Sequence, residues 1–314
     1  TSPINDAPTK AFFDEYDYFG LDRDNVVFLI QGQMPCFDFE GRLLLREKGA
    51  LAQAPDGHGG SLKALHDAGA LQDMRDRGVD YISYFQVDNP LVSVLDPLFV
   101  GLHHLEGAEM SNRMLAKREP FEKLGLFCRV DGRLHVVEYS DLPDELAVQT
   151  DDDGKLRYVA GSPAIHVISR AFVEQLNEGG CSLPFHRAEK KIPFVDDRGE
   201  AVEPTEPNGV KLEMFVFDAL PLAQTTMILE AEREDEFAPV KNASGEDSPD
   251  SCRRLMQERF ARWLQAHGVD VPRDDNGELA CRLEIAPARY LCATDLAHAD
   301  LPAAIEPGSD FYLE

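Results

Sequence analysis

A glycine-rich stretch, APDGHGGSLKAL at residues 54–65, contains residue types that suit phosphate binding. Its three glycines surround His58, and glycine lets a backbone approach a ligand closely. Ser61 follows as the expected N-cap of a helix, whose N-terminal N–H groups attract anions. The helix is predicted from apolar residues that recur at helical spacing, Leu62, Leu65, Ala68, Leu71 and Met74. The stretch therefore fits a nucleotide or a phosphorylated sugar, although glycine-rich turns also precede helices that bind nothing.

Two polar residues are expected at strand ends on either side of this stretch. Residues 25–30 (NVVFLI) form a nearly continuous apolar run, typical of a strand buried on both faces, and lead to Gln31. Residues 81–87 (YISYFQV) form a second such run, which ends at Asp88. A strand, a helix and a strand in this order predict an α/β sheet with right-handed crossovers. Ligands of such sheets bind outside the carboxyl ends of the strands, so Gln31 and Asp88 are candidate site residues.

Further elements are predicted from capping and turn signals. Asp96 and Pro97 predict the start of a helix over residues 97–105, and Asp131–Gly132 predicts a hairpin between residues 125–130 and 134–139. A polar segment at residues 244–250 divides an expected catalytic domain, 1–245, from a C-terminal domain, 246–314. A hairpin is also expected at residues 36–45, short strands at 156–161, 165–169, 226–231 and 282–285, and helices at 7–19, 170–177, 211–220 and 252–267.

Composition excludes several classes of partner. The chain has 31 basic and 57 acidic residues and a net charge of −26, which disfavours nucleic acid and anionic membranes. No apolar run has the length of a membrane span, and no signal-peptide pattern occurs. The six cysteines include no CxxC pair, which indicates buried thiols in a reducing compartment and predicts a cytoplasmic location.

Seven segments together resemble the eukaryotic-type UDP-sugar pyrophosphorylases, and most closely the UDP-N-acetylhexosamine pyrophosphorylases. They occur in the family's order and with similar spacing over about residues 1–265. The resemblance implies a Rossmann-like mixed sheet of the nucleotidyltransferase (GT-A-like) type, N-terminally incomplete, with a small C-terminal domain. The segments are YFGLDRDNVVFLIQGQMP (18–35), APDGHGG (54–60), VDNPLV (87–92), GLFCRVDG with VVEYS (125–140), KKIPFVD (190–196), PNGVKLEMFVFD (207–218) and EREDEFAPVKNA (232–243).

The resemblance also implies the reaction. Members of the family join UTP to a sugar 1-phosphate, which gives a UDP-sugar and pyrophosphate. The sugar phosphate attacks the α-phosphorus of UTP in line, so the reaction needs alignment and charge neutralisation, which lysines and Mg²⁺ supply. Two alternatives are a glycosyltransferase with Asp88–Asn89 as its metal motif and a non-catalytic UDP-sugar-binding or scaffold protein.

Individual residues match functional positions of the family. Gln31 and Gly57 match uridine-binding positions, and Asp88 matches the aspartate that holds Mg²⁺. Lys211 and Lys241 match lysines that contact the phosphates of UTP and of the sugar phosphate. The sugar-side positions are Gly125, Glu138 and Tyr139, together with His58 and Ser162. Each match has a structural alternative: Asp88 could cap a turn, Glu138 could pair across a hairpin, and the lysines could be surface charges.

Three departures from the family pattern modify these expectations. The UTP-binding loop of form GGxGTRLG and its following lysine are absent, so we expect a missing N-terminal segment and no turnover by the 314-residue chain alone. His58 and Ser162–Pro163 stand where the family usually has Asn beside the sugar. The two changes predict a preference for a sugar 1-phosphate without an N-acetyl group, such as glucose or galactose 1-phosphate. The sequence does not determine the sugar, the oligomeric state or the regulation.

Overall fold

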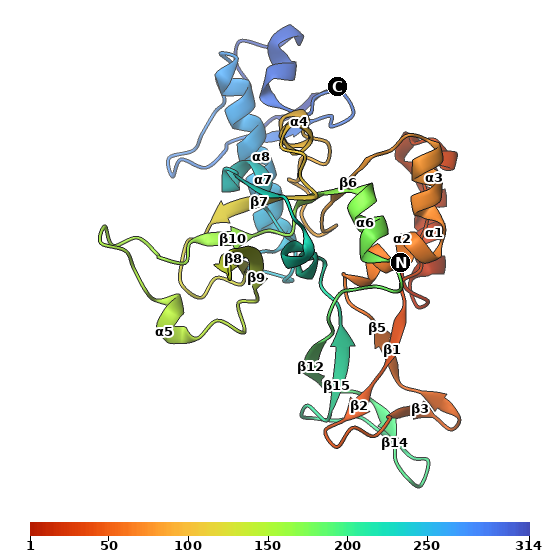
Figure 1. Cartoon of the computed structure of the whole chain (residues 1–314). Coiled ribbons are helices and arrows are strands. Elements are labelled where there is room, and N and C mark those ends of the chain that lie inside the picture. Colours follow the sequence, from red (N-terminus) through yellow and green to blue (C-terminus); the bar gives the residue numbers. More distant parts are fainter.

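The computed structural model describes all residues from 1 to 314 (Figure 1). Its main sheet has seven strands in the order β6-β11-β7-β10-β8-β9, and β16 pairs with β7. The β16–β7 pair is parallel and the other pairs are antiparallel, which confirms the predicted mixed α/β sheet. The strands of this sheet are β6 (Tyr81–Tyr84), β7 (Met110–Ala116), β8 (Gly125–Val130), β9 (Arg133–Val137), β10 (Ala160–Ser162), β11 (His166–Ser169) and β16 (Thr226–Glu230).

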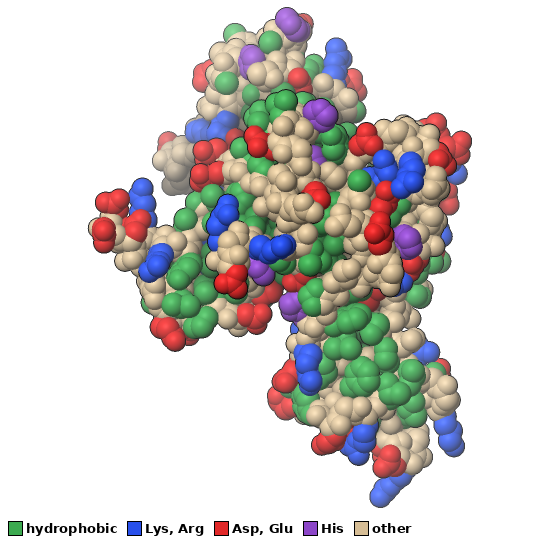
Figure 2. Space-filling view, in the orientation of Figure 1, with side chains coloured by type: hydrophobic (Ala, Val, Ile, Leu, Met, Phe, Trp, Pro, Cys, Tyr) green, Lys and Arg blue, Asp and Glu red, His purple; other side chains and the backbone are tan.

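A second lobe lies below this sheet in Figure 1 and is built from short strands. β15 pairs with both β12 and β2, while β1 pairs with β5 and β13 with β14. Figure 2 shows hydrophobic side chains gathered over this lobe, and Phe39 and Leu43 are half exposed. Its strands are β1 (Gln33–Pro35), β2 (Phe37–Asp38), β3 (Leu45–Glu47), β4 (Ala50–Leu51), β5 (Gln53–Pro55), β12 (His186–Lys190), β13 (Phe194–Val195), β14 (Ala201–Val202) and β15 (Gly209–Glu213).

Most helices begin and end near the predicted positions. The Asp96 side chain accepts a hydrogen bond from the Leu98 backbone N–H at 2.8 Å, as expected of a cap. No helix has the length and apolar character needed to cross a bilayer. The α-helices are α1 (Asp6–Glu15), α2 (Gly60–Asp67), α3 (Ala70–Asp76), α4 (Pro97–Leu105), α5 (Asp144–Ala147), α6 (Arg170–Leu176), α7 (Arg233–Glu236) and α8 (Pro249–Ala266), and the 3₁₀ helices are η1 (Asp17–Gly20), η2 (Arg23–Asn25), η3 (Val216–Leu222) and η4 (Ala293–His298).

The helix after the glycine-rich stretch differs from its prediction in two details. Gly59, rather than Ser61, is the N-cap of α2, and the Ser61 hydroxyl donates instead to the His58 carbonyl at 2.7 Å. The predicted single helix is broken between α2 and α3 at Gly69, whose φ of 74° suits glycine. Its apolar face is confirmed, because Leu62 and Leu71 are buried in the main core.

The strand predicted at residues 25–30 does not form. This segment belongs to no strand, and Val27 and Ile30 are 61% and 50% exposed. A strand requires a neighbouring backbone to pair with, and the backbone of this segment is bonded across the sequence only to Thr1, whose N-terminus donates to the Leu29 carbonyl at 2.8 Å and whose carbonyl accepts from the Gln31 N–H at 3.0 Å. The expected strand–helix–strand unit, with its right-handed crossover, is therefore wrong, and β6 receives its partner from β11.

The helix predicted at residues 211–220 is also wrong. The first part of that segment belongs to β15, whose Lys211 lies opposite Ala188 of β12. The second part forms the 3₁₀ helix η3, where Val216 and Leu220 are buried. Pairing with β12 and β2 satisfies the backbone of β15 and so overrides its local helical pattern.

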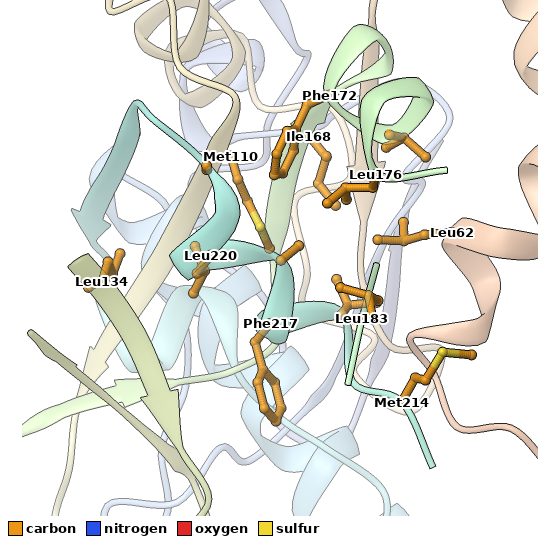
Figure 3. Packing of buried hydrophobic residues seen from close by; sticks show 14 of the residues in the cluster. Leu62, Met110, Leu134, Ile168, Phe172, Leu176, Leu183, Met214, Phe217 and Leu220 are labelled. Atoms are coloured by element: carbon orange, nitrogen blue, oxygen red, sulfur yellow. The ribbon is translucent and has the colours of Figure 1, made fainter. Parts of the chain in front are cut away.

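The main hydrophobic core lies between the sheet and the helices that cover it (Figure 3). Figure 3 shows Leu62 of α2, Met110 of β7, Ile168 of β11 and Phe217 of η3 directed into it. The end of the chain has a separate core that includes Phe260 and Leu264 of α8. This second core also contains Leu283 of β17 (Arg282–Ile285), which pairs in parallel with β18 (Asp310–Leu313).

α8 packs on the part of the chain that precedes residue 245. Leu91 is fully buried and shares a cluster with Ala238 and Cys252 of α8. The Arg259 guanidinium donates to the carbonyls of Leu91 at 2.8 Å and Asp235 at 3.1 Å. α8 begins after the boundary predicted near residue 245, and its side chains contact residues on the other side of that boundary.

Candidate functional site

The glycine-rich loop is held against the segment that follows β15. The Gly59 N–H donates to the Met214 carbonyl at 2.8 Å, and the Met214 N–H donates to the Asp56 carbonyl at 2.7 Å. A Cβ at Gly59 would lie 2.7 Å from the Met214 carbonyl carbon and 2.8 Å from the Phe215 backbone. Only glycine allows this approach, so the loop and the Met214–Phe217 segment form one unit.

Gln31 supports the same loop from its other side. Its Nε2 donates to Oδ1 of Asp56 at 3.2 Å and to the Gly57 carbonyl at 3.1 Å. Asp56 is buried, and burial raises the pKa of its carboxyl group. The structure therefore brings together Gln31 and Gly57, which the sequence predicts to bind uridine.

Gln31 and Gly57 line a pocket of about 340 Å³, here named the loop pocket. Its other walls come from α2, from β6 and from the unpaired segment before Gln31. They are largely apolar, which suits a flat ring more than a phosphate. The remaining lining residues are Thr1, Val27, Phe28, Leu29, Ser61, Leu62, Ala64, Leu65, Ile82 and Tyr84.

A second pocket, of about 130 Å³, lies on the other side of the loop and is here named the hairpin pocket. Six residues predicted from the sequence line it: His58, Gly125, Glu138, Tyr139, Ser162 and Lys241. Adjacent loop residues, Gly57 and His58, line the two pockets, which therefore adjoin. Pro163, which the sequence analysis places beside the sugar, also lines the hairpin pocket. Lining residues that the sequence reasoning missed are Gln86, Lys123, Leu124, Val136, Ala164, Phe217 and Phe237.

The predicted hairpin of β8 and β9 positions the side chains of this pocket. Its turn is confirmed, with φ of 51° at Asp131 and 81° at Gly132, and Gly125 lies opposite Ser162 of β10. A Cβ at Gly125 would lie 2.7 Å from the Val136 side chain. Ala164 follows β10 with φ of 57°, a conformation that strains a residue other than glycine.

Charges of both signs border the hairpin pocket. Glu138 lies just after β9, and burial, followed by the nearby charge of Asp141, raises the pKa of its carboxyl group. Lys123 and Lys241 contribute cations, so the pocket can hold an anionic ligand beside a carboxylate that accepts hydroxyl groups. Lys123 lies two residues before Gly125, and this proximity is the only sequence signal that could have identified it.

His58 is the one aromatic nitrogen donor among the predicted residues. Its Nδ1 accepts a hydrogen bond from the Val216 backbone N–H at 3.2 Å. Burial lowers the pKa of His58 to about 4, so the ring is neutral at pH 7. The neutral ring therefore carries its proton on Nε2.

Asp88 and Lys241 belong to two segments that are joined by hydrogen bonds. The Val240 N–H donates to the Asp88 carbonyl at 2.8 Å. Asn89 is buried and donates to the Glu236 carbonyl at 2.7 Å, while its own amide oxygen accepts from the Ala238 N–H at 2.9 Å. The turn that carries Asp88 is thus fixed beside the segment that carries Lys241.

Two of the predicted residues lie outside both pockets. Lys211 lies in β15, on the second lobe, and Asp88 lies on its turn beyond Gln86. No group of three or more His, Cys, Asp or Glu side chains could hold a metal ion, so Asp88 belongs to no such group. All six cysteines are free.

Comparisons with known proteins agree with this geometry. The family model of UTP–glucose-1-phosphate uridylyltransferase matches residues 1–274. The chain is 40% identical over 302 residues to mouse UDP-N-acetylhexosamine pyrophosphorylase-like protein 1, covering 91% of this chain and 60% of that protein. It is 39% identical over 274 residues to Arabidopsis thaliana UDP-N-acetylglucosamine diphosphorylase 2, covering 85% of this chain and 53% of that protein.

A solved structure shares the fold over the whole chain. The crystal structure assigned as a UDP-N-acetylglucosamine pyrophosphorylase of Entamoeba histolytica matches with a TM-score of 0.87 and 32% identity, covering 100% of this chain and 76% of that one. The chain spans between half and two thirds of the length of the curated relatives described above. These similarities give no support to the non-catalytic alternative.

Proposed function

The chain belongs to the UTP–glucose-1-phosphate uridylyltransferase family, and from this we propose that the protein joins UTP to a sugar 1-phosphate and releases pyrophosphate. The supporting observation is that two adjoining pockets meet at the glycine-rich loop. The loop pocket would bind the uracil and ribose, and the hairpin pocket would bind the sugar. The phosphates would lie between them, where the loop backbone and Lys241 are close.

Alignment and charge neutralisation carry the proposed reaction. The sugar phosphate oxygen attacks the α-phosphorus of UTP, and the bond to pyrophosphate breaks. Lys241 would neutralise charge on the phosphates, and Lys211 would do so from β15 when substrate draws the second lobe toward the sheet. Glu138 would accept sugar hydroxyl groups, with Gly125, Tyr139 and Ser162 as its neighbours in the wall.

A magnesium ion fits the donors that the chain offers. Mg²⁺ keeps several waters and is usually bound through one or two carboxylates together with substrate phosphates. The single carboxylate of Asp88, on a fixed turn next to the Lys241 segment, suits this mode. When bound, the ion would neutralise charge on the phosphates, and the protein would contribute Asp88 as its ligand.

The hairpin pocket supports a sugar without an N-acetyl group. An acetamido group needs one donor and one acceptor, whereas the acceptor nitrogen of His58 is already used by Val216. Ser162 is shorter than Asn, and Pro163 has no N–H to compensate. An unpaired buried polar group costs roughly 1–3 kcal/mol, which favours glucose or galactose 1-phosphate. The six free thiols support a cytoplasmic location.

The test of the function uses binding and turnover. Calorimetry with the 314-residue chain should detect UDP-glucose binding, and Lys241→Gln should weaken it at least tenfold, while Lys155→Gln on an exposed loop should not. We further propose that turnover requires the GGxGTRLG loop, which residues 1–314 lack. Pyrophosphate release from UTP and glucose 1-phosphate should appear only when a segment carrying that loop is supplied. Failure of both UDP-glucose binding and turnover would refute the function.

The sugar preference is tested separately, with the loop segment supplied. Specificity constants for glucose 1-phosphate and N-acetylglucosamine 1-phosphate are compared side by side. A tenfold or greater preference for the N-acetylated substrate would refute the proposed sugar.

A further inference from the structure

Three aromatic rings from distant parts of the sequence stack beside the hairpin pocket. The ring centroids of His58 and Phe215 are 5.1 Å apart with an interplanar angle of 23°. Those of Phe215 and His186 are 4.6 Å apart at 29°. The rings come from the glycine-rich loop, from the segment after β15 and from the first residue of β12, so the stack connects both lobes.

The outer end of the stack is fixed by a hydrogen bond. Nε2 of His186 lies 2.7 Å from Oδ2 of Asp218. A carboxylate oxygen only accepts, so Nε2 carries the proton. The Asp218 N–H in turn donates to the Phe215 carbonyl at 3.1 Å, which closes the turn that carries the central ring.

The inner end of the stack is fixed by the same segment. The Val216 N–H donates to Nδ1 of His58, which leaves Nε2 as the nitrogen that carries the proton. Residues 214–218 therefore hold His58 through one hydrogen bond and two ring contacts, from Phe215 and from Phe217 at 5.6 Å, and Phe215 is in turn stacked on His186. None of these contacts requires His186 to touch a ligand.

We propose that His186 and Asp218 are positioning residues of the hairpin pocket, which hold Phe215 against His58 and so orient the only N–H that His58 offers a sugar. The expected effect on ligand binding rests on the proposed function. The orientation of His58 does not, because it is a property of the protein without ligand. A His186–Asp218 pair that served only to stabilise the fold would have a different effect on His58. If the pair only added stability, its removal would leave the ring of His58 unchanged.

The test distinguishes the role of Asp218 as a hydrogen-bond acceptor from the role of its negative charge. Asp218→Ala removes the acceptor for His186, whereas Asp218→Asn retains an amide oxygen that can accept the same N–H. His186→Ala removes the ring. His267→Ala is the control, because His267 also donates through Nε2, to the Ala293 carbonyl, but lies in the C-terminal part.

The first measurement is made without ligand. In protein labelled with ¹⁵N-histidine, the ring signals of His58 are assigned by their loss in His58→Ala. We expect those signals to shift or broaden in Asp218→Ala and His186→Ala, to return toward the parent in Asp218→Asn, and to stay unchanged in His267→Ala. Parent-like His58 signals in both Asp218→Ala and His186→Ala would overturn the proposal, whether or not the protein binds UDP-sugars.

The second measurement is the affinity for UDP-glucose. Asp218→Ala should weaken binding at least threefold in the parent but not in a His58→Ala background, because the effect acts through His58. Equal losses in both backgrounds would overturn the role in positioning. If the parent itself fails to bind UDP-glucose, the proposed function fails, and the His58 signals alone decide the positioning role.

Discussion

Nδ1 of His58 lies 3.2 Å from the backbone nitrogen of Val216, and this hydrogen bond determines which ring nitrogen carries the proton. Because the pKa of His58 is lowered to about 4, the ring stays neutral at pH 7. The residue therefore offers the pocket one donor, whereas an asparagine amide would offer a donor and an acceptor.

His58→Asn should change the preference between sugars. The amide can pair with both polar groups of an acetamido substituent, so we expect the affinity ratio of UDP-N-acetylglucosamine to UDP-glucose to rise about tenfold, which is about 1.4 kcal/mol. Calorimetry with both ligands measures the ratio. His66→Asn, on the exposed face of α2, is the control and should leave it unchanged. A ratio that is the same in His58→Asn and the parent would contradict this assignment.

Gly59→Ala and Gly101→Ala should have opposite effects. A methyl group at position 59 would collide with the Met214–Phe215 backbone, so we expect a loss of roughly 1–3 kcal/mol in unfolding free energy and weaker UDP-glucose binding. Gly101 lies within α4 with no atom within 4 Å of an added Cβ, so alanine should stabilise the protein by about 1 kcal/mol. Urea unfolding compares the two, and equal stabilities would exclude the close contact of the loop.

Asn89→Ala should destabilise the turn beside Asp88. It leaves the Glu236 carbonyl and the Ala238 N–H buried without partners, and each costs about 1–3 kcal/mol. Asn242→Ala is the control, since its amide donates to Glu246 at an exposed site and should change stability by less than about 0.5 kcal/mol. Urea unfolding of both variants measures the difference. A loss in Asn89→Ala no larger than in the control would show that the buried amide does not hold the turn.

Stability should fall as the pH decreases from 7 to 5. Burial lowers the pKa of His58 and His103 to about 4 and that of His166 to about 3, against 6.5 when unfolded. The unfolded chain then binds more protons below pH 6.5, and each histidine should cost roughly 2 kcal/mol of stability by pH 5. Urea midpoints measured across this range should decrease, and less so in His103→Gln. Buried carboxyl groups with raised pKa values, such as those of Asp56 and Glu138, act in the opposite direction, so a profile equally steep in the parent and in His103→Gln is the result that would contradict a buried neutral His103.

Asp88→Asn should show whether Asp88 binds the metal ion or only caps its turn. With the loop segment supplied, turnover at saturating Mg²⁺ should decrease by at least tenfold, while unfolding free energy should change by no more than about 1 kcal/mol. Asp96→Asn, at the cap of α4, is the control and should show the reverse pattern. Parent-like turnover in Asp88→Asn would remove this residue from the mechanism.

Elements with local signals were predicted well, and those that depend on distant partners were not. The Asp96 cap and the Asp131–Gly132 turn each act within a few residues, so their positions follow from the sequence alone. Residues 25–30 have the composition of a strand but a backbone that bonds across the sequence only to Thr1, and residues 211–220 have a helical pattern but pair in part with β12. Strand pairing is a tertiary property that neither segment encodes by itself.

In the site, too, residues with a local sequence signal were predicted and residues that depend on distant partners were not. The motifs identified His58, Glu138 and Lys241 because each lies within a segment that resembles the family, and the structure brings them to one pocket. His186 lies outside those segments, and Asp218 ends one of them without matching a functional position, so the significance of the pair arises only from the ring stacked beside it. Whether Lys211 contacts phosphate stays a prediction, since it lies outside both pockets.

The packing of α8 limits how this protein can be shortened. Leu91 has no exposed surface because Ala238 and Cys252 cover it, and the Arg259 side chain holds the Leu91 carbonyl. Deletion after residue 245 would uncover Leu91 and leave that carbonyl without its donor, directly below the turn that carries Asp88. Residues 246–314 therefore support the site. A protein truncated after residue 245 would lose the packing that fixes the turn of Asp88, where the phosphates are proposed to bind.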